Sequence, residues 1–168
     1  LNKGKSFMRM AGGLPCVAVH DLVIHPRDND IVLGTHGRSI YIAGINELQQ
    51  LTDSILAKDI YAFAIKPVNF NNSWGKSESK WDEPNVPKKD IPLYIKASTK
   101  LTLKIKTEKG LTVKQLQADA VKGLNYINYD LTIDSAYVVP YQTQLNENKK
   151  REDKEIKIAV SDDGRYYL

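Results

Sequence analysis

The stretch HDLVIHPRDNDIVLGTHGRSIYI, residues 20–42, decides the fold expected for this chain. It consists of three short apolar runs, the second and third rich in β-branched residues, separated by polar segments at residues 26–30 and 36–39. Proline fixes φ and lacks a backbone donor, Asp and Asn tolerate tight turns, and Gly37 permits a positive φ, so both polar segments are typical of turns. The stretch therefore predicts a three-stranded meander.

The overall composition predicts a folded chain of two small domains. Its 168 residues are 42% apolar and 26% charged, which is ordinary for a globular protein and argues against extended disorder. This length fits one ordinary domain or two small ones, and a shift in composition near residue 67 favours two. Because the chain begins with Leu1 rather than Met, we expect a piece of a longer protein.

Charge, hydropathy and cysteine content exclude several classes of partner and site. The net charge of +4 comes from 24 basic and 20 acidic residues, and acidic residues dilute the densest basic run, residues 149–151. We therefore expect no nucleic-acid partner. No apolar stretch approaches the roughly 20 residues that span a bilayer, so we expect no membrane span. The single cysteine, Cys16, excludes an internal disulfide and a multi-cysteine zinc site.

The N-terminal part resembles a known repeat family. Asn2, Gly4, Ser6 and Phe7 are similar to the last six positions of the Asp-box of sialidase-like β-propellers, Ser-x-Asp-x-Gly-x-Thr-Trp. Residues 13–42 resemble, in order, spacing and composition, the final blade of large secreted proteins described as BNR-repeat or glycosyl-hydrolase-like, which are related in fold to the sortilin propeller. The resemblance implies a closing propeller blade and a secreted, periplasmic or cell-surface location.

A helix and a strand are expected to lead the chain away from this blade. Apolar residues at helical spacing predict one helix over residues 46–56, with Asn46 as its N-cap. Residues 59–66 read as a strand that ends before Pro67. We therefore assign residues 1–66 to the blade with its exit helix and strand. Residues 67–91 lack periodicity, which indicates a linker or a loop packed on its neighbours.

The remainder of the chain is rich in predicted strands. They cover residues 92–97, 101–107, 111–116, 126–133 and 155–160. Short strands at regular spacing favour a β-sandwich. The segment 135–154 is ambiguous between a strand with a long hairpin and a short helix around residues 141–148, and residues 165–168 read as the beginning of a further strand.

A second resemblance covers this part. Gly123-Leu124-Asn125 followed by Tyr129-Asp130-Leu131 is similar to the immunoglobulin-like accessory domain of the same BNR-repeat proteins and of flagellar hook-cap proteins, where Trp is more usual than Tyr129. It implies an immunoglobulin-like β-sandwich over residues 92–168. The predicted fold is thus mainly all-β: a partial β-propeller blade with a short helix, followed by an immunoglobulin-like sandwich.

The histidines of the meander raise the possibility of a metal site. If residues 26–30 close the first hairpin, His25 faces Ile31 and His20 faces His36. Two opposed imidazoles can bind a metal, but a zinc site generally takes three or four ligands and no third is evident on that face. We therefore predict no metal and no cofactor, and expect these imidazoles to hydrogen-bond to loop backbone.

Arg38 is the strongest catalytic candidate, although a weak one. Sialidases bind a substrate carboxylate with arginines, whose planar fork suits bidentate contacts. Arg38, His36 and Asp21 could therefore contribute to a glycosidase-type site gathered from several blades. The alternative is a turn arginine that pairs with Asp21 or Asp28. Because the chain contains about one blade, we do not expect it to be catalytic by itself.

Two tryptophans stand in the polar segment before the predicted sandwich. Trp74 and Trp81 could stack on sugar rings, or they could seal the junction between blade and sandwich, which we favour.

These features predict a C-terminal fragment of a secreted, glycosyl-hydrolase-like BNR-repeat protein, acting as a non-catalytic structural or binding module. The alternatives are a contribution to a glycosidase active site of the whole propeller, and receptor-like binding of a protein or peptide. Expected partners are the rest of the parent propeller, a carbohydrate ligand, and further copies of the chain bound through exposed blade faces.

Overall fold

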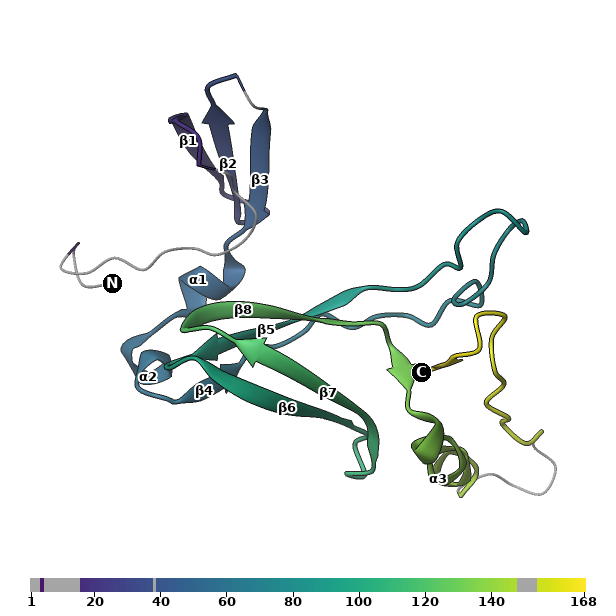
Figure 1. Ribbon diagram of the computed structural model, residues 1–168. Coiled ribbons are helices and arrows are strands. Elements are labelled where there is room, and N and C mark those ends of the chain that lie inside the picture. Colours follow the sequence, from purple (N-terminus) through teal and green to yellow (C-terminus); the bar gives the residue numbers. More distant parts are fainter. Residues whose placement is uncertain (1–3, 5–15, 38, 148–153) are drawn as a thin grey trace. The chain divides into compact units, whose positions relative to one another are not determined.

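The computed structural model describes residue 4 and residues 16–37, 39–147 and 154–168 (Figure 1). Of the described residues, 38% are in strands and 14% in helices, and the strands form several small antiparallel sheets. The mainly β character predicted from the sequence is therefore confirmed. The finer assignment, a propeller blade followed by an immunoglobulin-like sandwich, stays a prediction.

The chain forms two compact units. The first unit combines the described residues up to Ala64 with Pro92–Ser98 and Ala120–Tyr126, and the second combines Ile65–Ile91, Thr99–Asp119 and Ile127–Leu168. Each unit has its own cluster of buried side chains.

The meander predicted from residues 20–42 is confirmed as a three-stranded sheet in the first unit (Figure 1). Strands β1 (Val19–His25), β2 (Asp30–Thr35) and β3 (Ile40–Gly44) pair antiparallel in chain order. The turn between β1 and β2 contains Asn29 at φ 54°. The backbone N–H of Asn29 donates to the carbonyl of His25 at 3.0 Å and closes this turn.

The predicted register of this hairpin is wrong by one residue. His25 pairs with Asp30, and Ile24 pairs with Ile31. The cause is that Asp30 belongs to β2, so that four residues, not five, close the turn. A bulge between Val19 and Asp21 then leaves His20 without a partner in the register.

The single helix predicted over residues 46–56 is also wrong, because the structure has two short helices. Helix α1 spans Asn46–Gln50 and helix α2 spans Asp53–Leu56. They are separated where Leu51 adopts extended backbone, with φ −67° and ψ 100°. The break lets Leu51 and Ile55 both pack in the core of this unit.

The N-cap of α1 is Ile45, not the predicted Asn46. The amide oxygen of Asn46 instead accepts a hydrogen bond from Nδ2 of Asn29, at 3.2 Å. This bond ties the start of the helix to the first turn of the meander.

The core of the first unit lies next to strand β4 (Ile60–Ala62), which is shorter than the predicted strand 59–66. β4 pairs antiparallel with β5 (Lys89–Ile95), and the sheet order is β4-β5-β8, with β8 spanning Gly123–Tyr129. Buried Ile55, Phe63 and Tyr94 form the centre, and Leu51, Tyr61 and Leu124 pack around them.

Gly123-Leu124-Asn125 form the start of β8, where local contacts fix the backbone. Gly123 adopts φ 110°, a conformation that favours glycine. The Asn125 side chain accepts from the Val121 N–H at 2.9 Å and donates to the Val121 carbonyl at 2.7 Å. One amide group therefore satisfies both backbone groups of Val121, two residues before β8 begins.

In the second unit, β6 (Thr99–Lys106) pairs with β7 (Thr112–Ala120), and β9 (Thr132–Ile133) pairs with β10 (Tyr166–Tyr167). The predicted strand 126–133 is split into β8 and β9, because Leu131 between them adopts φ 56°. The ambiguous segment after β9 forms a helix, α3 (Ser135–Asn146), which begins well before the predicted residue 141 and contains Pro140.

The strand predicted over residues 155–160 is wrong, because side chains of α3 take its backbone groups. The N–H of Ile156 donates to Oδ1 of Asn146 at 2.8 Å, and the N–H of Ile158 donates to Oε1 of Gln142 at 3.0 Å. Ile158 also packs on the core cluster of buried Val113, Ile133 and Val138. The segment is thus held along the helix rather than in a sheet.

Candidate functional site

The histidines predicted to face each other do come together. The rings of His20 and His36 have centroids 5.0 Å apart and planes tilted by 35°. The cause of this contact differs from the predicted one, because the observed register of β1 and β2 is shifted by one residue. The bulge at His20 brings the two rings together, along with a hydrogen bond from the His36 N–H to the Ala18 carbonyl at 3.0 Å. Within the described residues, no group of three or more His, Cys, Asp or Glu side chains could hold a metal ion.

The other members of the weak catalytic set do not complete a site. Arg38 lies outside the described residues, as do Asn2, Ser6 and Phe7 of the Asp-box-like segment. Asp21 is exposed, and its carboxylate accepts a hydrogen bond from the N–H of the adjacent Leu22 at 2.8 Å. Asp28, one of the partners considered for Arg38, already pairs with Arg27 at 2.8 Å and with His25 at 3.1 Å.

The two tryptophans differ in role. Trp74 is half-buried, with its ring edge-on to Phe70 at 5.4 Å and tilted against Tyr167 at 6.2 Å. Its carbonyl accepts a hydrogen bond from Oγ of Ser161 at 2.8 Å. Trp74 therefore fixes residues 67–91 to the C-terminal part of the second unit, as expected for the packed loop rather than for a free linker.

Trp81 stands in the same segment but is 95% exposed. Its ring has no aromatic partner in the part of the chain that the structure describes. Trp81 therefore makes no sealing contact among the described residues, and the contacts of Trp74 lie within the second unit, so a seal between blade and sandwich stays a prediction. A role in ligand contact stays open for Trp81.

Sequence reasoning missed a cluster around Gly75 and Asp163. The Gly75 carbonyl accepts a hydrogen bond from the Asp163 N–H at 3.1 Å, and the Asp163 side chain is only 6% exposed. Its carboxylate accepts from the Tyr167 hydroxyl at 2.5 Å and from the Arg165 N–H at 3.0 Å. Burial, followed by the hydrogen bond to Asp163, raises the pKa of Tyr167 to about 12. The cluster holds the C-terminal strand in place, and the only hint in the sequence is the turn-forming Asp163-Gly164.

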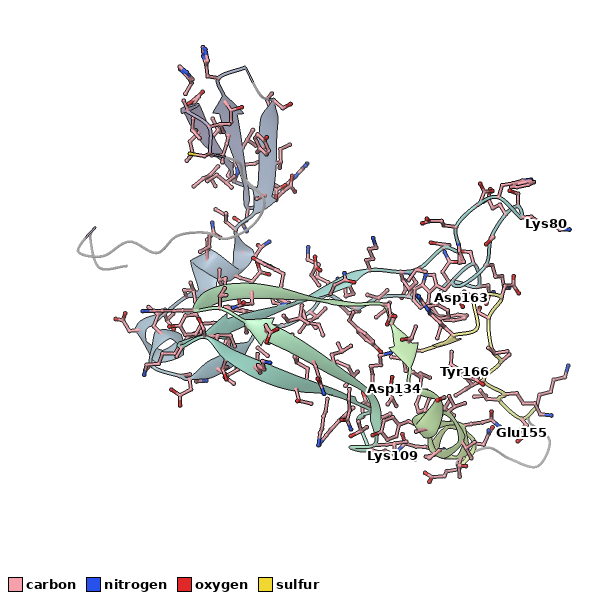
Figure 2. The ribbon with its side chains drawn as sticks, in the orientation of Figure 1. Lys80, Lys109, Asp134, Glu155, Asp163 and Tyr166 are labelled. Atoms are coloured by element: carbon pink, nitrogen blue, oxygen red, sulfur yellow. The ribbon has the colours of Figure 1, made fainter. Side chains whose placement is uncertain are left out.

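A second polar network stands between β7 and the start of α3 (Figure 2, near Asp134). Nζ of Lys114 lies 2.8 Å from Oγ1 of Thr132 and 3.0 Å from Oδ1 of Asp134. Thr132 Oγ1 in turn donates to Asp130 at 2.6 Å. Burial, with a smaller contribution from the charge of Asp130, raises the pKa of Tyr129 above its ordinary value. Every buried side-chain nitrogen or oxygen of the described residues has a hydrogen-bond partner, so this network supports the fold.

One open cavity of about 300 Å³ lies along the β6–β7 hairpin. It is lined by Lys100, Leu101, Thr102, Gln117, Ala118 and Asp119. Asp119 is the sole carboxylate of this lining, whereas glycoside hydrolysis requires two that flank the scissile bond. The lining also lacks histidine, cysteine and an aromatic platform. This cavity therefore lacks the pair of carboxylates that the alternative, a glycosidase-type site, requires.

Comparisons with protein-family models, with characterised proteins and with solved structures find no match for this chain. None of the described helices combines the length and the apolar content needed to cross a membrane.

Proposed function

We propose that this chain is a non-catalytic structural module of a secreted, glycosyl-hydrolase-like BNR-repeat protein, in which β1–β3 is a blade packed between neighbouring sheets. The resemblance of residues 13–42 to a closing blade supports the family. One structural observation carries the proposed packing: both faces of the meander carry exposed apolar side chains at their centre.

The pairing assigns each side chain to a face, because directly opposed residues of antiparallel strands point to the same side. Leu33 on β2 is opposed by Leu22 on β1 and by Tyr41 on β3. These three side chains define the Leu22 face, which also carries Ile24, two residues further along β1. Val23, Val32 and Ile42 define the Ile42 face, which also carries Ile40. The residues of β1 and β3 on these two faces include Leu22, Val23, Ile24, Ile40 and Ile42, which are between 48% and 68% exposed.

A sheet with one solvated face alternates apolar and polar residues, whereas a sheet covered on both faces is apolar throughout. The centre of the meander has the second pattern, and its polar strand residues, such as Asp21, His25 and Asp30, lie toward the strand ends. A propeller blade meets this condition, because each blade packs face to face with two neighbours around a central axis. The partner that fits each face is therefore another flat apolar sheet.

The proposal can be tested by placing one lysine on each face, with Leu22→Lys and Ile42→Lys in the same chain. We expect the unmodified chain to bind the apolar-surface dye bis-ANS and to self-associate in light scattering, since both faces are exposed. The double variant should lose most of both signals and keep its circular dichroism spectrum. Val139→Lys, at another exposed apolar position on α3, is the matched control and should change neither signal.

A longer parent protein gives the decisive comparison. There the same two lysines should destabilise the fold by several kcal/mol, because neighbouring sheets would bury two charges without partners. A parent that tolerates both lysines without loss of stability would rule out the blade assignment. A monomeric 168-residue chain that binds no dye would equally contradict it.

A further inference from the structure

The segment that carries Trp81 is an ordered loop with a closed neck. Asn85 closes it from both sides: its carbonyl accepts from the Gly75 N–H and its own N–H donates to the Lys76 carbonyl, each at 2.9 Å. Nδ2 of Asn85 also donates to Oγ of Ser73, at 2.7 Å. Gly75 is buried next to Asp163, so the neck is anchored to the packed part of the second unit.

Trp81 is held at the tip of this loop. Its backbone N–H donates to Oγ of Ser79 at 3.2 Å, and the N–H of Asp82 donates to the Ser79 carbonyl at 3.2 Å. The neighbouring Lys80 lies at the outer end of the loop in Figure 2. A tryptophan has the largest apolar surface of any side chain and is usually well buried. Here two hydrogen bonds of the turn present the whole indole to solvent.

Charged side chains surround Trp81 and are free to contact a ligand. Within the described part of the chain, the side chains of Glu78, Lys80, Asp82 and Glu83 make no hydrogen bond or ion pair, and all four residues are exposed. With Lys76, this tip carries two positive and three negative charges. A flat apolar ring is thus surrounded by both acceptors and donors, with a slight excess of negative charge.

We propose that the Trp81 loop, residues 76–84, binds a neutral carbohydrate by stacking a pyranose ring on the indole. The apolar C–H face of a sugar matches an exposed aromatic ring, and its hydroxyls need both donors and acceptors at the rim. The excess of carboxylates disfavours phosphate groups, and with them nucleic acid and anionic lipid. This site does not depend on the blade assignment, because its residues all belong to the second unit.

The test is a titration of the full chain with four neutral oligosaccharides: cellohexaose, xylohexaose, mannohexaose and chitohexaose. We expect saturable quenching of tryptophan fluorescence by at least one of them, with heat of binding in calorimetry. Trp81→Ala should weaken that binding about tenfold or more, because it removes the stacking surface. Trp81→Phe should restore part of it, which a merely structural role would not predict.

Phe70→Ala is the matched control, because Phe70 is an exposed aromatic residue of the same segment. It should leave the affinity unchanged. Circular dichroism of each variant confirms that the fold is intact. Three outcomes would overturn the proposal: no binding of any of the four sugars, equal affinity of the chain and Trp81→Ala, or a Trp81 fluorescence shift with phosphatidylcholine vesicles but not with sugars.

Discussion

The meander β1–β3 and the cluster around Val113 contain the same kinds of residue in opposite environments. Ile40 and Ile42 of the meander are 68% and 66% exposed, whereas Val113 and Ile133 of the cluster are 1% and 4% exposed. Both pairs of residues stand in β-strands. Strand sequence alone therefore does not decide which apolar residues become core.

The difference comes from segments distant in the sequence. The cluster is closed by Val138 from α3, by Ile158 from the segment after it, and by Tyr166 from the C-terminal strand. The described residues offer no comparable cover to the meander, whose exposed isoleucines belong to neither core cluster. The described residues therefore cover the cluster and leave the meander uncovered, as expected if the proposed blade packs on neighbouring sheets.

The largest expected effect contrasts one isoleucine from each region. Ile133→Ala should lower the free energy of unfolding by about 2–5 kcal/mol, because it leaves a cavity in a closed core. Ile42→Ala should change it by less than about 0.5 kcal/mol, because that side chain is exposed. Urea denaturation followed by circular dichroism measures both. Equal losses would remove the contrast between the two regions.

A second prediction concerns how the second unit closes. A Cβ on Gly75 would lie 2.6 Å from Cβ of Ser161, 2.6 Å from Cε2 of Tyr167 and 2.8 Å from Oδ1 of Asp163. Gly75→Ala should therefore cost about 1–3 kcal/mol more than a substitution with backbone strain alone. Gly110→Ala supplies that reference, since Gly110 has a similar φ of 84° with open space around its Cβ position. Similar stabilities of the two variants in urea would show that the loop is not packed there.

The smallest effect is a dependence on pH. The pKa of Tyr167 is raised to about 12, so the fold favours the neutral phenol. Its contribution should be complete below the ordinary pKa of about 10 and should be lost as the pH rises from about 10 to about 12. The stability difference between the chain and Tyr167→Phe, measured at pH 9 and pH 11, should therefore shrink. A constant difference would contradict the raised pKa of Tyr167, which burial and the hydrogen bond to Asp163 produce.

Local patterns succeeded where the cause of a structure is local. The turn at residues 26–29 follows from Pro26 and Asn29, whose backbone preferences act over a few residues. The same patterns failed by one residue in the register of β1 and β2, because turn length depends on whether Asp30 pairs in the sheet. They also failed for residues 155–160, which were predicted as a strand, because side chains of α3 accept hydrogen bonds from the backbone N–H groups of this segment.

The two tryptophans also show the limit of local patterns. Trp74 and Trp81 are indistinguishable in the sequence, since both stand in a polar segment without periodicity. Contact with Tyr167 leaves Trp74 half-buried, and the turn at Ser79 presents Trp81 to solvent. Both distinctions depend on contacts that no local pattern contains.

By itself, the sequence determined the mainly β character, the meander and its turns, because short-range backbone preferences and apolar patterns are sufficient for them. Only the tertiary structure decided which apolar strands are covered, which tryptophan is exposed, and that the segment after β9 is a helix. Those outcomes follow from packing between distant segments, whose energy depends on surfaces brought together by the fold.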